Sequence, residues 1–388
     1  MRAHVTVSWP EEPLPALALP ADLLMERLGG LWAPLADAVT ENGPGCLWAL
    51  RWEEGAGWQV LSVPPHDAGD GPVAETPGSR ERDAWVVASA LAEIAFGRRP
   101  RDLADAYDLL DLHAGTVLGL DAVVHALFSG GNPAQVHAVV QPGERVPVLV
   151  RAAAETAVGS GKAGYDPECD NEDSLMVARI GGGVLALGVC DGVTGSGDGS
   201  GALASRIAVR EMRDVLTSGG DVMKALAAAD KAVQQGTFGA STALVATLAP
   251  DGTAELYSIG DSPAWLVRRR RRGGRIAFRL TPDQTVLAEA RRTDPDASIG
   301  GSHLTQNLGG KADEPYRATI EVQPGDLLVL MSDGAAIPDH GWFGLELAAM
   351  AEAHPTAPAL AAALTARAER LGGRDNATAV IAEIHATP

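Results

Sequence analysis

Three aspartates stand next to apolar stretches of strand length. Asp191 follows VLALGVC, Asp333 follows LLVLMS, and Asp375 precedes ATAVIAEI. A carboxylate at the end of a buried strand is costly unless a cation or a hydrogen bond compensates it. Oxygen ligands of this kind suit Mg²⁺ or Mn²⁺, whereas a zinc site would call for Cys or His ligands. The pattern indicates a hard-metal site if the three strand ends converge, which the spacing alone leaves open.

A glycine directly follows two of these aspartates, in Asp191-Gly192 and Asp333-Gly334. One Asp-Gly pair is usually an ordinary turn. Glycine also lets a backbone carbonyl approach a ligand closely. Repetition of the pair at two strand ends therefore favours a binding site over two unrelated turns.

Composition excludes several classes of protein. The chain has 388 residues, with 31 basic against 50 acidic side chains and a net charge of −19, which disfavours binding to nucleic acid. No apolar stretch approaches the 18 or so residues of a membrane helix, and the first residues do not resemble a signal peptide. Cys46, Cys169 and Cys190 have no metal or disulfide spacing. We expect a cytoplasmic protein without membrane or nucleic-acid partners.

A change of pattern near residue 150 predicts two domains, residues 1–147 and 148–388. Six of the eight tryptophans fall in the first part, enough apolar surface for a separate core. That part is expected to be a smaller mixed α/β domain of unknown function, with regulation or partner binding as its candidate role and a hairpin formed by residues 46–52 and 58–63. Its helices are predicted at residues 21–39, 83–96, 102–112 and 118–128.

The second part alternates short apolar strands with alanine-rich helices. Consecutive strands with short turns are antiparallel, and helices inserted in pairs must cover the faces of the sheets. The fold class is therefore α+β, a layered α-β-β-α sandwich of two antiparallel sheets. Strands are predicted at residues 175–180, 184–189, 241–248, 254–259, 264–268, 275–280, 327–331 and 377–384, and helices at 202–216, 222–235 and 358–371.

Seven short motifs occur in one order along residues 148–388. They are NEDS (171–174), VCDGVTGSGDGSGALAS (189–205), GASTALVATL (239–248), GDSPAWLV (260–267), LTPDQT (280–285), PGDLLVLMSDG (324–334) and RDNATAV (374–380). In this order they resemble the metal-dependent serine/threonine protein phosphatases of the PPM, or type 2C, family. The family fold, two stacked antiparallel sheets with helices outside, agrees with the fold predicted from the pattern.

The resemblance implies a role for each matching residue. Asp191 matches an aspartate that bridges two metal ions, the carbonyl of Gly192 matches a ligand of one of them, and Asp333 and Asp375 match the other aspartate ligands. The remaining matches are Asp173, a catalytic acid that holds metal-bound water, and Glu172 and Asn376, which support the site. Two Mn²⁺ or Mg²⁺ ions would activate a water, so no Ser, Cys or His nucleophile is required.

Some positions depart from the family pattern. Glu168 stands where the family has an arginine that contacts phosphate, and we expect Lys162 to supply that contact instead. Thr237 replaces an aspartate that serves a third metal, and Gln284 replaces a histidine. Asp261 is interpreted as a turn residue and not as a ligand.

These observations favour a Mn²⁺- or Mg²⁺-dependent serine/threonine phosphoprotein phosphatase. Its partner would be a phosphorylated protein, the target of a serine/threonine kinase. Two alternatives stay open: a pseudophosphatase or regulatory binding module with weak or no turnover, motivated by Glu168 and Thr237, and a related hydrolase that acts on a small phosphorylated molecule.

Overall fold

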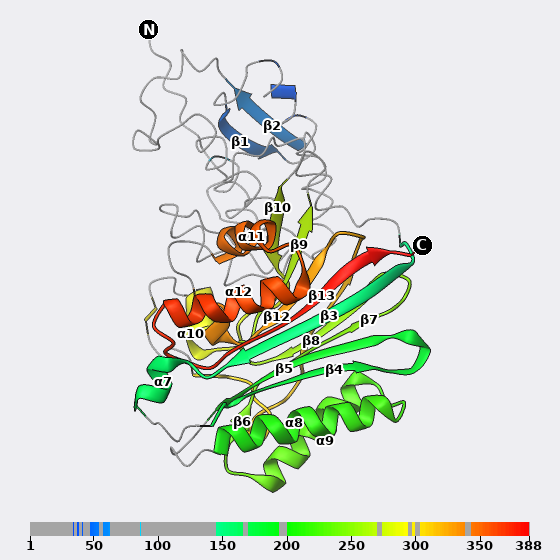
Figure 1. Cartoon of the computed structure of the whole chain (residues 1–388). Helices are drawn as coiled ribbons and strands as arrows, with labels where there is room; N and C mark the ends of the chain where they lie inside the picture. The colour runs from blue at the N-terminus through cyan, green and yellow to red at the C-terminus, as the bar shows by residue number, and fades with distance from the viewer. Residues whose placement is uncertain are drawn as a thin grey trace. The chain divides into compact units, whose positions relative to one another are not determined.

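The contacts between Cα atoms divide the chain into two compact units, Met1–Gln141 and Pro142–Pro388. The computed structural model (Figure 1) describes residues 145–387 except 166–169, 194–199, 270–273, 294–296, 299–302 and 338–342; of the first unit it describes 47–53, 57–62 and the single residues 34, 37, 38, 41 and 86.

The described part of the first unit contains a hairpin. Strands β1 (Leu47–Glu53) and β2 (Gly57–Ser62) pair antiparallel, with Trp52 opposite Trp58. The expected hairpin is therefore confirmed. The helices predicted in residues 1–147 lie outside the described residues, apart from the four single positions 34, 37, 38 and 86.

Two antiparallel sheets form the body of the second unit. One has the strand order β10-β9-β12-β13-β3, and the other has the order β11-β8-β7-β5-β4, with β6 paired to β5. The first contains β3 (Val148–Ala157), β9 (Ala264–Arg269), β10 (Arg275–Arg279), β12 (Leu327–Met331) and β13 (Ala377–Ala386). The second contains β4 (Asp173–Arg179), β5 (Leu185–Val193), β6 (Ala240–Ser241), β7 (Ala243–Leu248), β8 (Thr253–Ile259) and β11 (Tyr316–Glu321).

Helices cover the outer faces of both sheets (Figure 1). The pair α8 (Ser200–Thr217) and α9 (Val222–Gly236) packs on the second sheet through side chains such as Met212 and Leu226. The pair α11 (Phe343–Ala353) and α12 (Ala357–Arg370) packs on the first sheet through Leu347 and Leu360. The inner faces meet where β12 and β13 contact β5. The predicted α-β-β-α sandwich is confirmed.

Short elements complete the second unit. Helices α7 (Ser160–Tyr165) and α10 (Val286–Thr293) and the 3₁₀ turns η2 (Gly181–Gly183) and η3 (Asp333–Ala335) lie in the connections between the longer elements. None of the helices in the described part of the chain combines the length and apolar character that crossing a membrane requires.

Candidate active site

A cavity of about 470 Å³ gathers most of the residues singled out from the sequence. Three of the predicted aspartates, Asp191, Asp333 and Asp375, line it together. Its other lining residues are Lys162, Glu172, Gly192, Val193, Thr242, Asp261, His303, Leu304 and Asn307.

Strand register places Asp173 beside Asp191. The two residues are direct partners in the antiparallel pairing of β4 with β5. The neighbouring Gly192 N–H donates to the carbonyl oxygen of Glu172 at 3.0 Å, and Thr242 Oγ1 accepts from the Asp191 N–H at 2.9 Å. These bonds fix the backbone that carries both carboxylates.

A close glycine contact brings the other two aspartates to the same end of the first sheet. Asp333 begins η3 one residue after the end of β12, and Asp375 lies just before β13, the partner of β12. A Cβ added to Gly334 would lie 2.0 Å from the carbonyl oxygen of Asn376. Only glycine fits here, because any side chain would push the two loops apart.

The hydroxyl of Ser332 connects the two sheets at this site. Ser332 Oγ donates to Asp173 Oδ2 at 2.7 Å and accepts from the backbone N–H of Thr378 at 3.0 Å. Asp173 belongs to β4 in the second sheet, while Thr378 belongs to β13 in the first. Asp173 is thus held from both layers.

Crowding of the carboxylates perturbs their protonation. Burial raises the pKa of Asp173 to about 6, and the charges of Asp333 and Asp375 add to the effect. Burial also raises the pKa of Asp191 well above its ordinary value, with the charge of Asp173 as the next cause. Burial, followed by the charge of Asp375, raises the pKa of Asp333. Such a cluster carries a free-energy cost at neutral pH that a bound cation would offset.

The donor chemistry of the site fits a hard divalent cation. Asp173 Oδ1 and Asp333 Oδ1 are buried and have no hydrogen-bond partner in the described part of the chain. Unsatisfied buried carboxylate oxygens are what such an ion binds. Among the described residues, however, no three acidic, histidine or cysteine side chains are already arranged around a common ion position.

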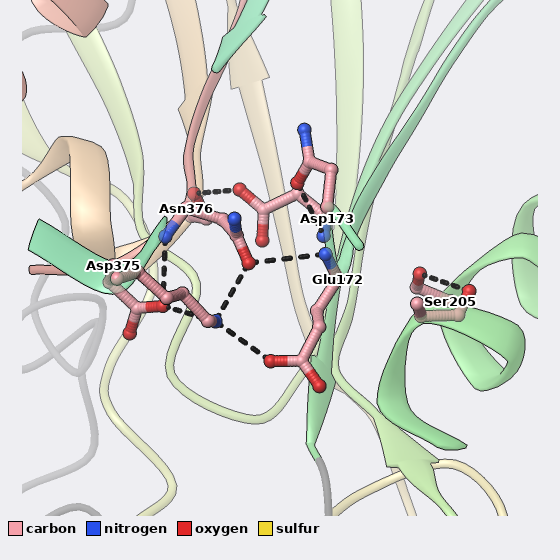
Figure 2. A network of polar contacts seen from close by, with 9 residues as sticks. Glu172, Asp173, Ser205, Asp375 and Asn376 are labelled. Carbon is pink, nitrogen blue, oxygen red and sulfur yellow. Dashed lines mark hydrogen bonds and ion pairs between the residues drawn. The ribbon is translucent and has the colours of Figure 1, made fainter. Parts of the chain in front are cut away.

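A lysine occupies part of the acidic cluster. Lys162 Nζ donates to Glu172 Oε2, Asp375 Oδ1 and Asn376 Oδ1, each at 2.7 Å. Figure 2 shows Glu172, Asp375 and Asn376 facing one another at this point. Asn376 Oδ1 also accepts from the backbone N–H of Glu172 at 3.1 Å. The expected contact of Lys162 with phosphate stays a prediction, and Glu168 lies outside the described residues.

Asp261 lies in a turn, as predicted, and also at the cavity. It follows β8 in a turn, and it also lies on the wall of the cavity. The turn is held by Gln284, whose Oε1 accepts from the Gly260 N–H at 2.6 Å. Burial raises the pKa of Asp261 to about 7, with the charges of Asp333 and Asp283 as further causes.

Two other wall residues, His303 and Asn307, were not singled out from the sequence. Their segment is joined to the Gln284 turn, because the Val286 N–H donates to the His303 carbonyl at 2.8 Å and the Thr305 N–H donates to the Gln284 carbonyl at 2.8 Å. The spacing of residues does not show that this segment packs against the LTPDQT motif, so no signal in the sequence pointed to His303 or Asn307.

Thr237 lies elsewhere. It lines a separate hollow with Leu203 and Phe238, and its hydroxyl donates to the carbonyl of Ser200 at 3.3 Å while accepting from the Gly239 N–H at 3.1 Å. The hydroxyl therefore serves the backbone at the end of α9, and Thr237 is not among the residues that line the acidic cavity.

Replacing Asp261 with Asn should stabilise the metal-free protein at alkaline pH. The native pKa of Asp261 is raised to about 7, so the folded state loses stability as pH rises from about 4 through 7, where the unfolded carboxyl is already ionised. Asn carries no charge. We expect a gain of about 1–3 kcal/mol at pH 8 that disappears towards pH 4, measured by urea unfolding in EDTA. Asp214→Asn, at an exposed site, is the control. If Asp261→Asn stabilised the protein equally at both pH values, the pKa of Asp261 would not be raised in the folded state.

Comparisons with known proteins agree with this geometry. The family model described as stage II sporulation protein E (SpoIIE) matches residues 181–385. A search of curated proteins found no match to the sequence. The resemblance to type 2C phosphatases is confirmed by this match together with the fold of solved phosphatase structures.

Among the solved structures, the serine/threonine phosphatase of S. agalactiae and Stp1 of Staphylococcus aureus are each 18% identical to this chain, with a TM-score of 0.51. The alignments cover 61% and 63% of this chain, and 99% of each phosphatase. The catalytic domain of PstP, solved with two manganese ions, is 23% identical over 61% of this chain and 99% of its own, with a TM-score of 0.47.

Proposed function

Because the chain belongs to the stage II sporulation protein E (SpoIIE) family, we propose that residues 148–388 form a Mn²⁺- or Mg²⁺-dependent serine/threonine phosphoprotein phosphatase. The observation that carries the proposal is the convergence of three aspartates, Asp191, Asp333 and Asp375, from both sheets on one cavity, with Asp173 beside Asp191 in the strand pairing. A structural role alone would not require so many like charges close together.

In this proposal each residue has a distinct task. Asp191, Asp333, Asp375 and the carbonyl of Gly192 would hold two ions, and Asp173, fixed by Ser332, would orient a water. When bound, such ions screen the phosphate charge and acidify a water. Asn376 positions Glu172 by accepting from its backbone N–H.

The proposal extends to the whole chain. We assign residues 1–147 to a separate domain that regulates the phosphatase or binds a partner. The substrate would be a cytoplasmic protein phosphorylated by a serine/threonine kinase, and the net charge of −19 disfavours nucleic acid as the alternative partner.

Hydrolysis assays on the full chain test the proposal. We expect release of p-nitrophenol from p-nitrophenyl phosphate with Mn²⁺ or Mg²⁺, loss of the activity with EDTA, and its return on addition of excess metal. A phosphothreonine or phosphoserine peptide should be preferred over phosphorylated metabolites. Hydrolysis that is indifferent to EDTA would contradict the metal assignment.

A pseudophosphatase is the second candidate, and one observation favours it. Lys162 Nζ donates a hydrogen bond to Oδ1 of Asp375, a residue that the phosphatase would use as a metal ligand. A protein that binds Mn²⁺ or a phosphopeptide but hydrolyses no substrate with any added metal would be a pseudophosphatase. Turnover of a metabolite with no turnover of phosphopeptides would instead support a small-molecule hydrolase.

A further inference from the structure

The ammonium group of Lys162 is completely used by the acidic cluster. It has three N–H donors, and its three acceptors, Glu172, Asp375 and Asn376, each lie at 2.7 Å. A lysine carries a positive charge at neutral pH. With all three N–H groups bonded, the ammonium group of Lys162 is held in place in the cluster.

The backbone that carries Lys162 is pressed against the loop that leads to Asp375. The Lys162 N–H donates to the Gly373 carbonyl at 2.9 Å, and the Ser160 N–H donates to Glu369 Oε2 at 3.0 Å. A Cβ added to Gly161 would lie 2.3 Å from the Gly372 carbonyl oxygen. This contact is too close for any other residue, so α7 keeps a set position relative to Asp375.

We propose that Lys162 is a positioning residue that acts as a tethered counter-ion: it holds Asp375 and Glu172 together without metal and competes with a divalent cation for Asp375. The competition rests on the proposed function, since it requires that Asp375 bind metal. The holding role does not.

The geometry explains the competition. A metal ion at Asp375 must share the carboxylate with the ammonium or displace it, and either event places two cations close together. The Asp375 side chain is 46% exposed, so a cation from solvent can reach it, whereas the Lys162 side chain is 23% exposed and reaches it from the protein side. Lys162 thereby sets the metal concentration at which the site fills.

Substitution of Lys162 by Met tests both roles in the full chain. The variant keeps a long apolar side chain and removes the charge. We expect the Kd for Mn²⁺, measured by isothermal titration calorimetry, to fall about tenfold, equivalent to about 1.4 kcal/mol. In EDTA its Tm should also fall, because Glu172 and Asp375 then repel without a counter-ion. Lys162→Arg, which keeps the charge, should restore the Tm. Lys224→Met, at an exposed ion pair, is the matched control and should change neither value.

Each outcome decides between the roles. If the wild type binds Mn²⁺ and the Kd of Lys162→Met is unchanged or higher, the competition is overturned but the holding role is not. If the Kd for Mn²⁺ is unchanged and the KM for phosphopeptide rises, Lys162 is a phosphate contact instead. Absence of Mn²⁺ binding in both proteins would overturn the competition together with the proposed metal site. An unchanged Tm in EDTA would overturn the holding role.

Discussion

Replacing Asp191 with Asn is expected to reduce Mn²⁺-dependent phosphatase activity by about a thousandfold or more while leaving the fold intact. Asp191 faces Asp173 across the strand pair and is affected by the charges of Asp333 and Asp375. The asparagine side chain removes a negative charge that interacts with the other carboxylates of the cluster, so metal binding and water activation are lost together. The measurement is kcat with p-nitrophenyl phosphate at saturating Mn²⁺.

The same substitution should raise the stability of the metal-free protein at pH 7. The pKa of Asp191 is raised in the folded state, so its ionisation opposes folding above the ordinary pKa of aspartate. Asp313→Asn, at an exposed ion pair, is the control and should change neither property. Near-normal turnover by Asp191→Asn would remove this residue from the metal site.

Replacing Gly192 with Ala should destabilise the protein by about 1–3 kcal/mol, the usual cost of overpacking, and reduce metal-dependent activity by at least about tenfold through misplacement of the neighbouring Asp191. The added Cβ would lie 2.2 Å from the carbonyl oxygen of Gly201 and 2.7 Å from that of Glu172. Both are backbone atoms, which cannot move aside as a side chain can. Urea unfolding and kcat measure the two effects.

Gly181→Ala is the matched control, because its Cβ would meet no atom within 4 Å and the backbone needs no positive φ there. It should leave stability and activity almost unchanged. Equal stability of Gly192→Ala and Gly181→Ala would show that the strand end at Gly192 has more room than the structure gives it.

The central strands could be predicted from the sequence because they are buried on both faces. In β7 (ALVATL) and β12 (LLVLM) every residue is buried, so a continuous apolar run marks each strand. The peripheral β3 (VLVRAAAETA) was missed. It lies at the edge of its sheet, only its first residue is buried, and its alanines are poor strand formers that suggest a helix.

Other elements were missed for lack of a periodic pattern. Strand β11 (YRATIE) is also at an edge and has only one buried residue, Ile320. Helix α11 is apolar nearly all round, so no single face marks it, and α7 and α10 are too short for periodicity to show.

The candidate site depended on strand register, which spacing cannot provide. Asp173 and Asp191 are 18 positions apart, and only the pairing of β4 with β5 makes them neighbours. The family resemblance indicated the grouping before the structure did. It did not reveal that Lys162 takes an oxygen of Asp375 or that Asp261 lines the cavity, because both depend on how short loops pack against each other.

The Ser332 hydroxyl has a consequence for how the domain comes apart. Because it bonds Asp173 of one sheet and the Thr378 backbone of the other, the layers cannot separate without exposing the acidic cluster to water. A ligand held by that cluster would then oppose separation of the whole sandwich and not merely fraying of one loop. Occupancy of the site would slow global unfolding, and resistance of the domain to proteases would follow metal supply in the cell.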